Sequence, residues 1–294
     1  MKRDQRAKSN TYPGIFTLLA WVLLTVLVSS CSEEVITLDL KGVEPKIVIE
    51  GILTDQGEPC TVKISKSGDF YDPGEYPPVT GAKVTLLDSE GNLETLAENA
   101  ENEPGLYRGE SLLGVEGRTY TLIVETGGET FEAVSTLMNA VEIDSLTYYF
   151  EDDPDTYIEE YEDMEEGYVF SCHFTYPDIE DNYYRIKLTH NGELLHDIFM
   201  VSDWYESGDN VEYDFSAYIF EENDTMNVEL LSIDKAAAEY FSTLNAVMLS
   251  SNTGPGFSAI PDNPITNISN GALGYFAAYS VRTKTVVFKK DTTD

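Results

Sequence analysis

Histidines, one serine turn and a surplus of carboxylates are the residues of this 294-residue chain that could do chemistry. His173, His190 and His196 lack the HExxH spacing of zinc sites, which favours surface or strand-edge roles. The turn at Gly256-Phe257-Ser258-Ala259-Ile260 lacks the second glycine that lets a nucleophile elbow close. Carboxylates are so numerous that no single pair stands out for glycoside hydrolysis. We therefore expect no catalytic residues, no metal site and no cofactor.

Cys31 is the thiol whose surroundings indicate a reaction. It follows a basic start, an apolar run over residues 15–28, and the small residues Ser29 and Ser30. The run is short for a membrane span but typical of an export signal.

These features resemble the lipobox of bacterial lipoproteins, in which the cysteine becomes the first mature residue and is acylated. The resemblance implies a signal peptide over residues 1–30, lipidation of Cys31 and anchoring in the outer membrane. Several acyl chains would hold the protein there, since each buried methylene contributes roughly 0.8 kcal/mol. The alternative is an uncleaved signal-anchor helix.

Ser32, Glu33 and Glu34 follow the cysteine directly. In lipoproteins of Bacteroidota, acids at this place resemble the signal that sends the protein to the outer face of the outer membrane, which implies exposure on the cell surface. The alternative is an acidic tether without a routing role.

The charge balance is strongly acidic, with 18 basic against 53 acidic residues and a net charge of −35. Nucleic acids and anionic headgroups both attract basic patches, so the balance argues against either as a partner. Aromatic residues make up 12% of the chain, which is enough to build a core despite the charge.

Residues 46–134 show period-two alternation in several short segments that are separated by turn residues. The apolar positions are Ile47/Ile49, Val62/Ile64, Val84/Leu86, Tyr120/Leu122/Val124 and Phe131/Ala133. Asp88-Ser89-Glu90-Gly91 and Gly127-Gly128 fit hairpin turns. The pattern predicts an immunoglobulin-like antiparallel β-sandwich over residues 31–140.

Residues 141–294 are predicted to form a second antiparallel β domain with one packed α-helix. Strands are expected through residues 168–176 and 184–188 and through Val228 and Leu230, with a hairpin at Asn191-Gly192. The helix spans 234–249, with Asp234 as its N-cap. The acid-rich run 151–166 has no glycine for the sharp turn of an EF-hand-type loop, so a solvated loop is favoured over calcium binding.

Two further cysteines, Cys60 and Cys172, each fall in the apolar phase of a predicted strand. This favours buried free thiols, although an exported protein permits a disulfide between them.

The long loop near the C-terminus is the main candidate for a partner or ligand contact, because long irregular loops are often functional. Its candidate contact residues are Asn263, Asn267, Asn270, Gly271, Gly274, Tyr275 and Phe276. The alternative is a structural loop that packs on the helix through its apolar residues. Trp204 and Tyr205 form a second candidate, since aromatic residues among acids can stack on sugar rings. The alternative is that they only anchor their loop.

Several motifs together give the chain a family resemblance. They are the lipobox followed by acids, Asp39-Leu40, Val48-Ile49-Glu50-Gly51, Ser65-Lys66-Ser67, Pro77-Pro78-Val79-Thr80-Gly81-Ala82, Asn267-Ile268-Ser269-Asn270 and Gly274-Tyr275-Phe276. They resemble the domain of unknown function 4249 family of Bacteroidota outer-membrane lipoproteins. The resemblance implies an accessory protein of a TonB-dependent transporter, and it assigns no activity or ligand residue.

Three hypotheses follow for function. The first is a lipid-anchored binding or accessory protein that works with a TonB-dependent transporter in nutrient uptake. The second is a surface adhesion or structural lipoprotein without a transporter partner. The third is an enzyme that acts on polysaccharides.

Overall fold

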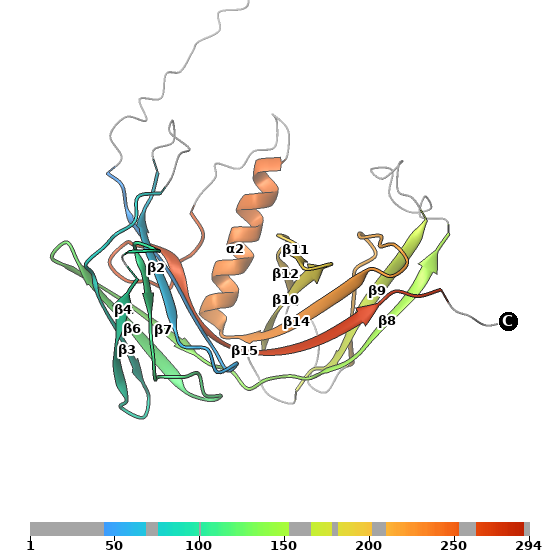
Figure 1. Cartoon of the computed structure of the whole chain (residues 1–294), viewed down its shortest axis with the longest axis horizontal. Helices are drawn as coiled ribbons and strands as arrows, with labels where there is room; N and C mark the ends of the chain where they lie inside the picture. The colour runs from blue at the N-terminus through green and yellow to red at the C-terminus, as the bar shows by residue number, and fades with distance from the viewer. Residues whose placement is uncertain are drawn as a thin grey trace, which may run out of the picture. The chain divides into compact units, whose positions relative to one another are not determined.

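The structure is a computed structural model that describes residues 44–68, 76–99, 101–152, 166–177, 182–201, 210–252 and 263–290. These residues form a mainly β fold with two sheets and a single helix, α2 (Lys235–Asn252), as expected (Figure 1). Most neighbouring strands are antiparallel, in a sandwich-like arrangement. No helix in this part of the chain is long and apolar enough to cross a membrane.

The larger sheet has twelve strands among the described residues, in the order β11-β10-β14-β15-β1-β2-β5-β4-β3-β6-β7, with β12 pairing β10. From the first half of the chain it takes β1 (Ile47–Thr54), β2 (Thr61–Lys66), β3 (Lys83–Asp88), β4 (Leu93–Glu98), β5 (Leu106–Arg108), β6 (Thr119–Thr126) and β7 (Glu129–Thr136). From the second half it takes β10 (Tyr183–His190), β11 (Glu193–Leu194), β12 (Phe199–Val201), β14 (Thr225–Ile233) and β15 (Leu273–Val287). The smaller sheet has the order β13-β9-β8, with β8 at Ile143–Glu151, β9 at Gly167–Thr175 and β13 at Asn210–Asp214.

Strand β15 joins the two halves of the chain. It runs parallel to β1, with Gly51 opposite Phe276, and antiparallel to β14, with Leu231 opposite Val281. The expected boundary at residue 140 lies in the connection between β7 and β8, but the large sheet takes strands from both sides of it. Residues from Glu44 onward cluster as one compact unit. Through this parallel pair, the strands of the predicted N-terminal sandwich share one sheet with strands from beyond residue 140.

Arg282 of β15 adds a polar link across the same junction. Its guanidinium donates to Asp55 after β1 at 2.6 Å, to Glu116 before β6 at 2.8 Å and to Glu142 before β8 at 2.7 Å. Burial alone would lower the pKa of Arg282, but the three carboxylates raise it. The side chain thus stays charged while it holds three separate segments together.

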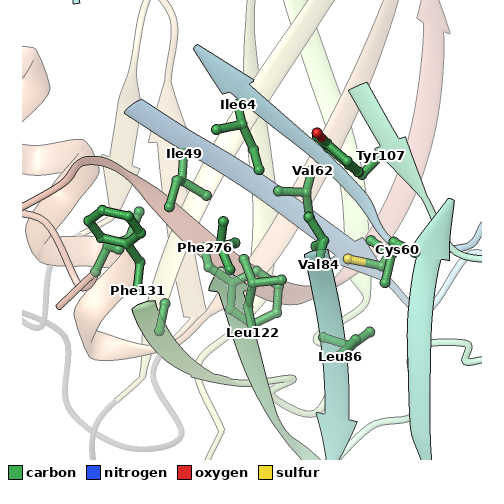
Figure 2. Close-up of a cluster of buried hydrophobic side chains, with 14 of the residues drawn as sticks. Ile49, Cys60, Val62, Ile64, Val84, Leu86, Tyr107, Leu122, Phe131 and Phe276 are labelled. Carbon is green, nitrogen blue, oxygen red and sulfur yellow. The ribbon is translucent and has the colours of Figure 1, made fainter. Parts of the chain in front are cut away.

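The first core confirms the alternation predicted for residues 46–134. Its central side chains all have relative exposures of 1% or less, and they include Ile49, Cys60, Val62, Ile64, Val84, Leu86, Tyr107 and Leu122 (Figure 2). Phe276 of β15 is also fully buried among them. Burying a side chain of this size contributes about 1.5–3 kcal/mol to the stability of the fold. Through Phe276, the C-terminal strand β15 is thus part of the core that the N-terminal strands form.

A second core lies between the smaller sheet and β10 and β14. It contains the predicted apolar faces of β9 and β10, including Phe170, Cys172, Phe174, Tyr184 and Ile186. Cys60 and Cys172 are buried free thiols in different cores, as the strand phase indicated. Burial raises the pKa of each thiol to about 12, which keeps both protonated.

The predicted turns are confirmed by their backbone angles. Gly127 and Gly128 have φ values of 61° and 84°, and Asn191 and Gly192 have values of 48° and 89°, so both pairs suit two-residue hairpins. Asp88 accepts hydrogen bonds from the backbone N–H groups of Glu90 and Asn92 at 3.0 and 2.8 Å, which closes the turn between β3 and β4.

Helix α2 begins as predicted. Oδ1 of Asp234 accepts from the N–H of Ala237 at 2.9 Å, which makes Asp234 the N-cap. Oδ2 accepts from the Ser135 hydroxyl at 2.7 Å and from the Thr136 N–H at 2.8 Å, so the same carboxylate ties the helix to β7. The helix ends at Asn252 rather than Leu249. Its first half lies against β10, β12 and β15 (Figure 1).

Candidate functional site

A cleft of about 770 Å³ lies at the end of the smaller sheet and is our candidate binding site. We call it the aromatic cleft. Its lining comes from β8, from the start of β9 and from the segments that precede β14 and follow β15. The lining residues are Leu146, Thr147, Tyr148, Tyr149, Phe150, Glu166, Gly167, Tyr168, Phe220, Glu221, Glu222, Lys289 and Lys290. Its volume lies within the usual range for ligand pockets.

The floor of the aromatic cleft, formed by Tyr168 and Phe220, rests on the buried ring of Phe288. The ring of Phe288 lies parallel to that of Phe220, with centroids 5.2 Å apart, and parallel to that of Tyr168, with centroids 5.9 Å apart. Tyr148 meets Phe288 edge to face at 5.5 Å, and Phe150 meets Tyr168 in the same way at 5.2 Å. Such contacts give the floor a fixed shape.

Backbone hydrogen bonds hold this floor. Tyr168 and Phe220 exchange two backbone bonds, at 2.8 and 2.9 Å. Gly167 permits this approach, because a Cβ there would lie 2.3 Å from a methyl carbon of Ile219 and 2.8 Å from the Phe220 carbonyl oxygen. Phe288 bonds through its N–H to Asp224 and through its carbonyl to Asn223. The aromatic cleft therefore depends on three segments that are distant in sequence.

Asp224 supports the wall beside Phe220. Its carboxylate accepts from the Asn191 amide at 2.7 Å and from the Glu221 N–H at 2.9 Å, and it lies 2.8 Å from Nε2 of His190. Burial would raise the pKa of Asp224, but these hydrogen bonds hold it below its usual value. The ionised carboxylate can thus fix the loop that carries Glu221 and Glu222.

The rim carries the groups that a partner would meet first. Tyr149 is 53% exposed and Phe150 is 48% exposed. Burial, together with the negative charges of Asp214 and Glu151, raises the pKa of Tyr149, so the phenol stays a neutral hydrogen-bond donor. Lys289 and Lys290 place two of the chain's few basic residues beside these rings.

Strand β8 gives the aromatic cleft a second property. It pairs with β9 on one side only and is an edge of the smaller sheet as described. The backbone groups on the other side of an edge strand can pair with an added strand. At its start, Nζ of Lys284 donates to the carbonyls of Ile143 and Asp144 at 3.1 and 2.7 Å. Lys284 thus covers the start of β8. The part of the edge that remains open to an added strand lies toward the end of β8, beside the exposed rings of Tyr149 and Phe150.

The C-terminal candidate segment is structural where the structure describes it. Oδ1 of Asn267 accepts from the Phe276 N–H at 3.0 Å, and its Nδ2 donates to the Phe276 carbonyl at 2.7 Å and to the Val134 carbonyl at 3.3 Å. Ser269 exchanges two hydrogen bonds of 2.8 Å with the backbone of Glu132. The segment therefore covers the outer edge of β7, which protects that edge from pairing with other chains.

Several residues expected to contact a partner are therefore unavailable for that role. Phe276 is fully buried and Gly274 is buried against Ile49, so neither residue is exposed to a partner in this structure. Tyr275 is partly buried under α2. Asn263, Asn270 and Gly271 are exposed, and their role as contacts stays a prediction.

The other sequence predictions fall in different places. Cys31, Ser32, Glu33, Glu34, Trp204 and Tyr205 lie outside the described residues, as does most of the acidic run 151–166. His173 lies on the central strand of the smaller sheet, 2.6 Å from the Thr147 hydroxyl, and His196 is exposed. In the described ranges, no group of three or more His, Cys, Asp or Glu side chains could hold a metal ion.

The residues of the aromatic cleft were missed by sequence reasoning. Leu146-Thr147-Tyr148-Tyr149-Phe150 consists of strand-forming residues, and that composition was the available signal. The segment does not alternate regularly between apolar and polar residues, however, and it directly precedes the acid-rich run 151–166.

Comparison with curated proteins found no match. Comparison with protein families found a match over residues 33–285 to the family described as Domain of unknown function (DUF4249). This span includes β1, the aromatic floor of β8 and β9, the Asn267 segment and nearly all of β15. The chain therefore belongs to the DUF4249 family.

Proposed function

We propose that this protein is a lipid-anchored accessory protein of the outer membrane that works with a TonB-dependent transporter in nutrient uptake. In this proposal its role is binding rather than catalysis, and it contacts the transporter through the aromatic cleft. The observation that carries the proposal is the pairing of two half-exposed aromatic side chains, Tyr149 and Phe150, with the free edge of β8. The transporter as partner is supported by the family resemblance, and the lipid anchor by the residues around Cys31.

The physical basis is strand addition combined with burial of aromatic surface. An extended segment of the partner would pair with β8, and each added backbone hydrogen bond would contribute about 0.5–1.5 kcal/mol. Its apolar side chains would cover Tyr149 and Phe150, at about 25 cal/mol per Å² of apolar area removed from water. Lys289 and Lys290 would favour a segment that also carries carboxylates, since they are the basic residues of the lining.

The test is co-purification from detergent-solubilised outer membrane. The variant replaces Tyr149 and Phe150 with serine, and the matched control is Leu93→Ser, because Leu93 is 64% exposed and lies on β4. Wild type and control should capture a TonB-dependent transporter identified by mass spectrometry, and the double variant should lose it while keeping its melting temperature. Capture of the transporter by all three proteins would reject the aromatic cleft as the contact.

Adhesion is the competing function, since a rim of exposed rings can also stack on sugars. An adhesin would bind purified glycans through Tyr149 and Phe150 and would purify without a transporter. Glycan binding without transporter capture would therefore replace the proposal with this alternative.

A further inference from the structure

Arg185 of β10 is a charged side chain that has no oppositely charged partner among the described residues. It lies on the sheet face beneath α2, and its guanidinium carbon is 4.2 Å from the centroid of the Phe241 ring. Its Nε is buried and has no hydrogen-bond acceptor. The ring contact offers a cation–π attraction, but it does not supply the acceptor that a buried N–H requires.

The other described arginines are all paired with carboxylates. Arg282 has three, Arg118 lies 2.8 Å from Asp88, and Arg108 lies 3.0 Å from Glu103. Arg185 forms no ion pair with any described residue, although the chain carries 53 acidic residues. Arg185 is partly buried, and its buried Nε lacks the acceptor that the other described arginines find in carboxylates.

Three tyrosines lie near enough to the guanidinium to interact with it electrostatically: Tyr240 from α2, and Tyr275 and Tyr279 from β15. The rings of Tyr240 and Tyr275 have centroids 4.6 Å apart, and those of Phe241 and Tyr275 are 5.0 Å apart. Burial raises the pKa of all three phenols, that of Tyr279 to about 12, so their hydroxyls stay protonated. Among the described residues, none of the three hydroxyls forms a hydrogen bond.

The two acidic residues on the same face of the sheet, Glu229 and Glu50, form no ion pair with Arg185. Glu229 is 3.0 Å from Nζ of Lys187, which uses its charge in another pair. Glu50 lies near Tyr240 and Tyr275, where its negative charge raises the pKa of both phenols, but it forms no ion pair with the arginine. The cluster is therefore a set of hydrogen-bond donors that lacks an acceptor.

We propose that Arg185, Tyr240, Tyr275 and Tyr279 form a binding site for an oxyanion, the carboxylate or phosphate group of a small ligand. Guanidinium presents a fork of N–H donors that matches either group, and phenol hydroxyls can donate to the same oxygens. The rings of Phe241 and Tyr275 supply an apolar wall for the part of the ligand that bears the anion. The site lies on a different face from the aromatic cleft and is independent of the transporter proposal.

A structural role is the competing explanation, in which Arg185 only holds α2 to β10 through its contact with Phe241. The two explanations differ for variants that remove hydroxyls alone. Tyr279→Phe keeps the ring and the packing but removes one donor. It weakens binding under our proposal and leaves any structural role of Arg185 intact.

The experiment is isothermal titration of the full-length protein in detergent at low ionic strength, with inorganic phosphate and benzoate as separate probes. We expect the wild type to bind at least one probe, and the stronger of the two identifies the anion class. Arg185→Gln should weaken binding by at least about tenfold, the scale expected for losing a charge-assisted bidentate contact. Arg185→Lys keeps the charge but loses the fork of N–H donors. Its affinity for the probe should lie between those of the wild type and Arg185→Gln.

Two further variants make the result decisive. Tyr279→Phe should weaken binding with an unchanged melting temperature, and Arg108→Gln, which removes an exposed paired arginine, should bind as the wild type does. The proposal is overturned if the wild type binds neither probe, or if Arg185→Gln or Tyr279→Phe binds as tightly as the wild type.

Discussion

At the scale of single residues, Asn267 shows how one side chain can replace several backbone interactions. Asn267 forms hydrogen bonds with both backbone groups of Phe276 and with the Val134 carbonyl. It therefore links the segment that covers the outer edge of β7 to both β15 and β7. An asparagine in an irregular loop has the same local appearance whether it faces solvent or completes a core. This is why sequence alone could not separate the contact role from the structural one.

We predict that Asn267→Ala destabilises the fold by about 1–3 kcal/mol, the cost of leaving buried backbone groups unpaired. Urea unfolding followed by circular dichroism measures the change. Asn102→Ala is the matched control, because the Asn102 side chain makes one exposed bond of 3.4 Å to Asn99. If Asn267→Ala keeps wild-type stability but loses partner binding, the structural assignment is refuted and the contact role returns.

Asp88 leads to a prediction about pH. Burial would raise its pKa, but hydrogen bonds from Asn92, Glu90 and Arg118 hold it below the ordinary value of 3.8. A lowered folded-state pKa means that the stabilisation is complete above 3.8 and is lost as pH falls through the folded-state value.

We therefore expect Asp88→Asn to be less stable than wild type at neutral pH, with the difference shrinking below about pH 4. Unfolding midpoints in urea from neutral to acidic pH measure this, and the difference between the two proteins isolates Asp88 from the other carboxylates. A difference that stays constant with pH would contradict the assignment.

At the scale of elements, the parallel pair of β1 and β15 is the least expected feature. Local alternation identifies strands but carries no information about a partner at the far end of the chain. Gly274 makes the pair possible, because its φ is +90° and a Cβ there would lie 2.1 Å from the Ile49 carbonyl oxygen.

We predict that Gly274→Ala destabilises the protein by more than about 2 kcal/mol, since it adds a backbone clash to an unfavourable φ. Gly271→Ala is the control, because Gly271 has a φ of +74° but nothing within 4 Å of the added carbon. It should cost only about 1 kcal/mol, from the backbone conformation alone. Equal losses in thermal unfolding experiments would show that the close approach to Ile49 is unimportant.

Sequence patterns identified the strands that have one clearly buried face. The alternating residues of β1, β2, β3, β6 and β7 are buried as predicted, and the turns and the Asp234 cap agree. Strand β8 was missed because Tyr148 packs on the floor while both Tyr149 and Phe150 are about half exposed, so no period-two pattern forms. The aromatic cleft was missed with it, since its walls meet only through tertiary contacts.

At the scale of the whole molecule, the proposed lipid anchor and the proposed contact surface belong to different parts of the chain. The proposed anchoring depends on Cys31, which lies outside the described residues. We predict that metabolic labelling with a fatty acid marks the wild type and misses Cys31→Ser, because the acyl chains need that thiol. A Cys60→Ser variant should label normally, because Cys60 is buried in the core. Equal labelling of the Cys31→Ser variant would exclude lipidation at this site.

The proposed function requires the aromatic cleft to touch a TonB-dependent transporter in the intact cell. The most direct measurement places a photo-crosslinking phenylalanine analogue at Phe150 or, as control, at Leu93, which is similarly exposed but lies on β4. On irradiation of living cells, we expect a crosslink between position 150 and a TonB-dependent transporter and none from position 93. A contact through the aromatic cleft is ruled out if position 150 forms no crosslink to such a transporter, or if position 93 forms it equally well.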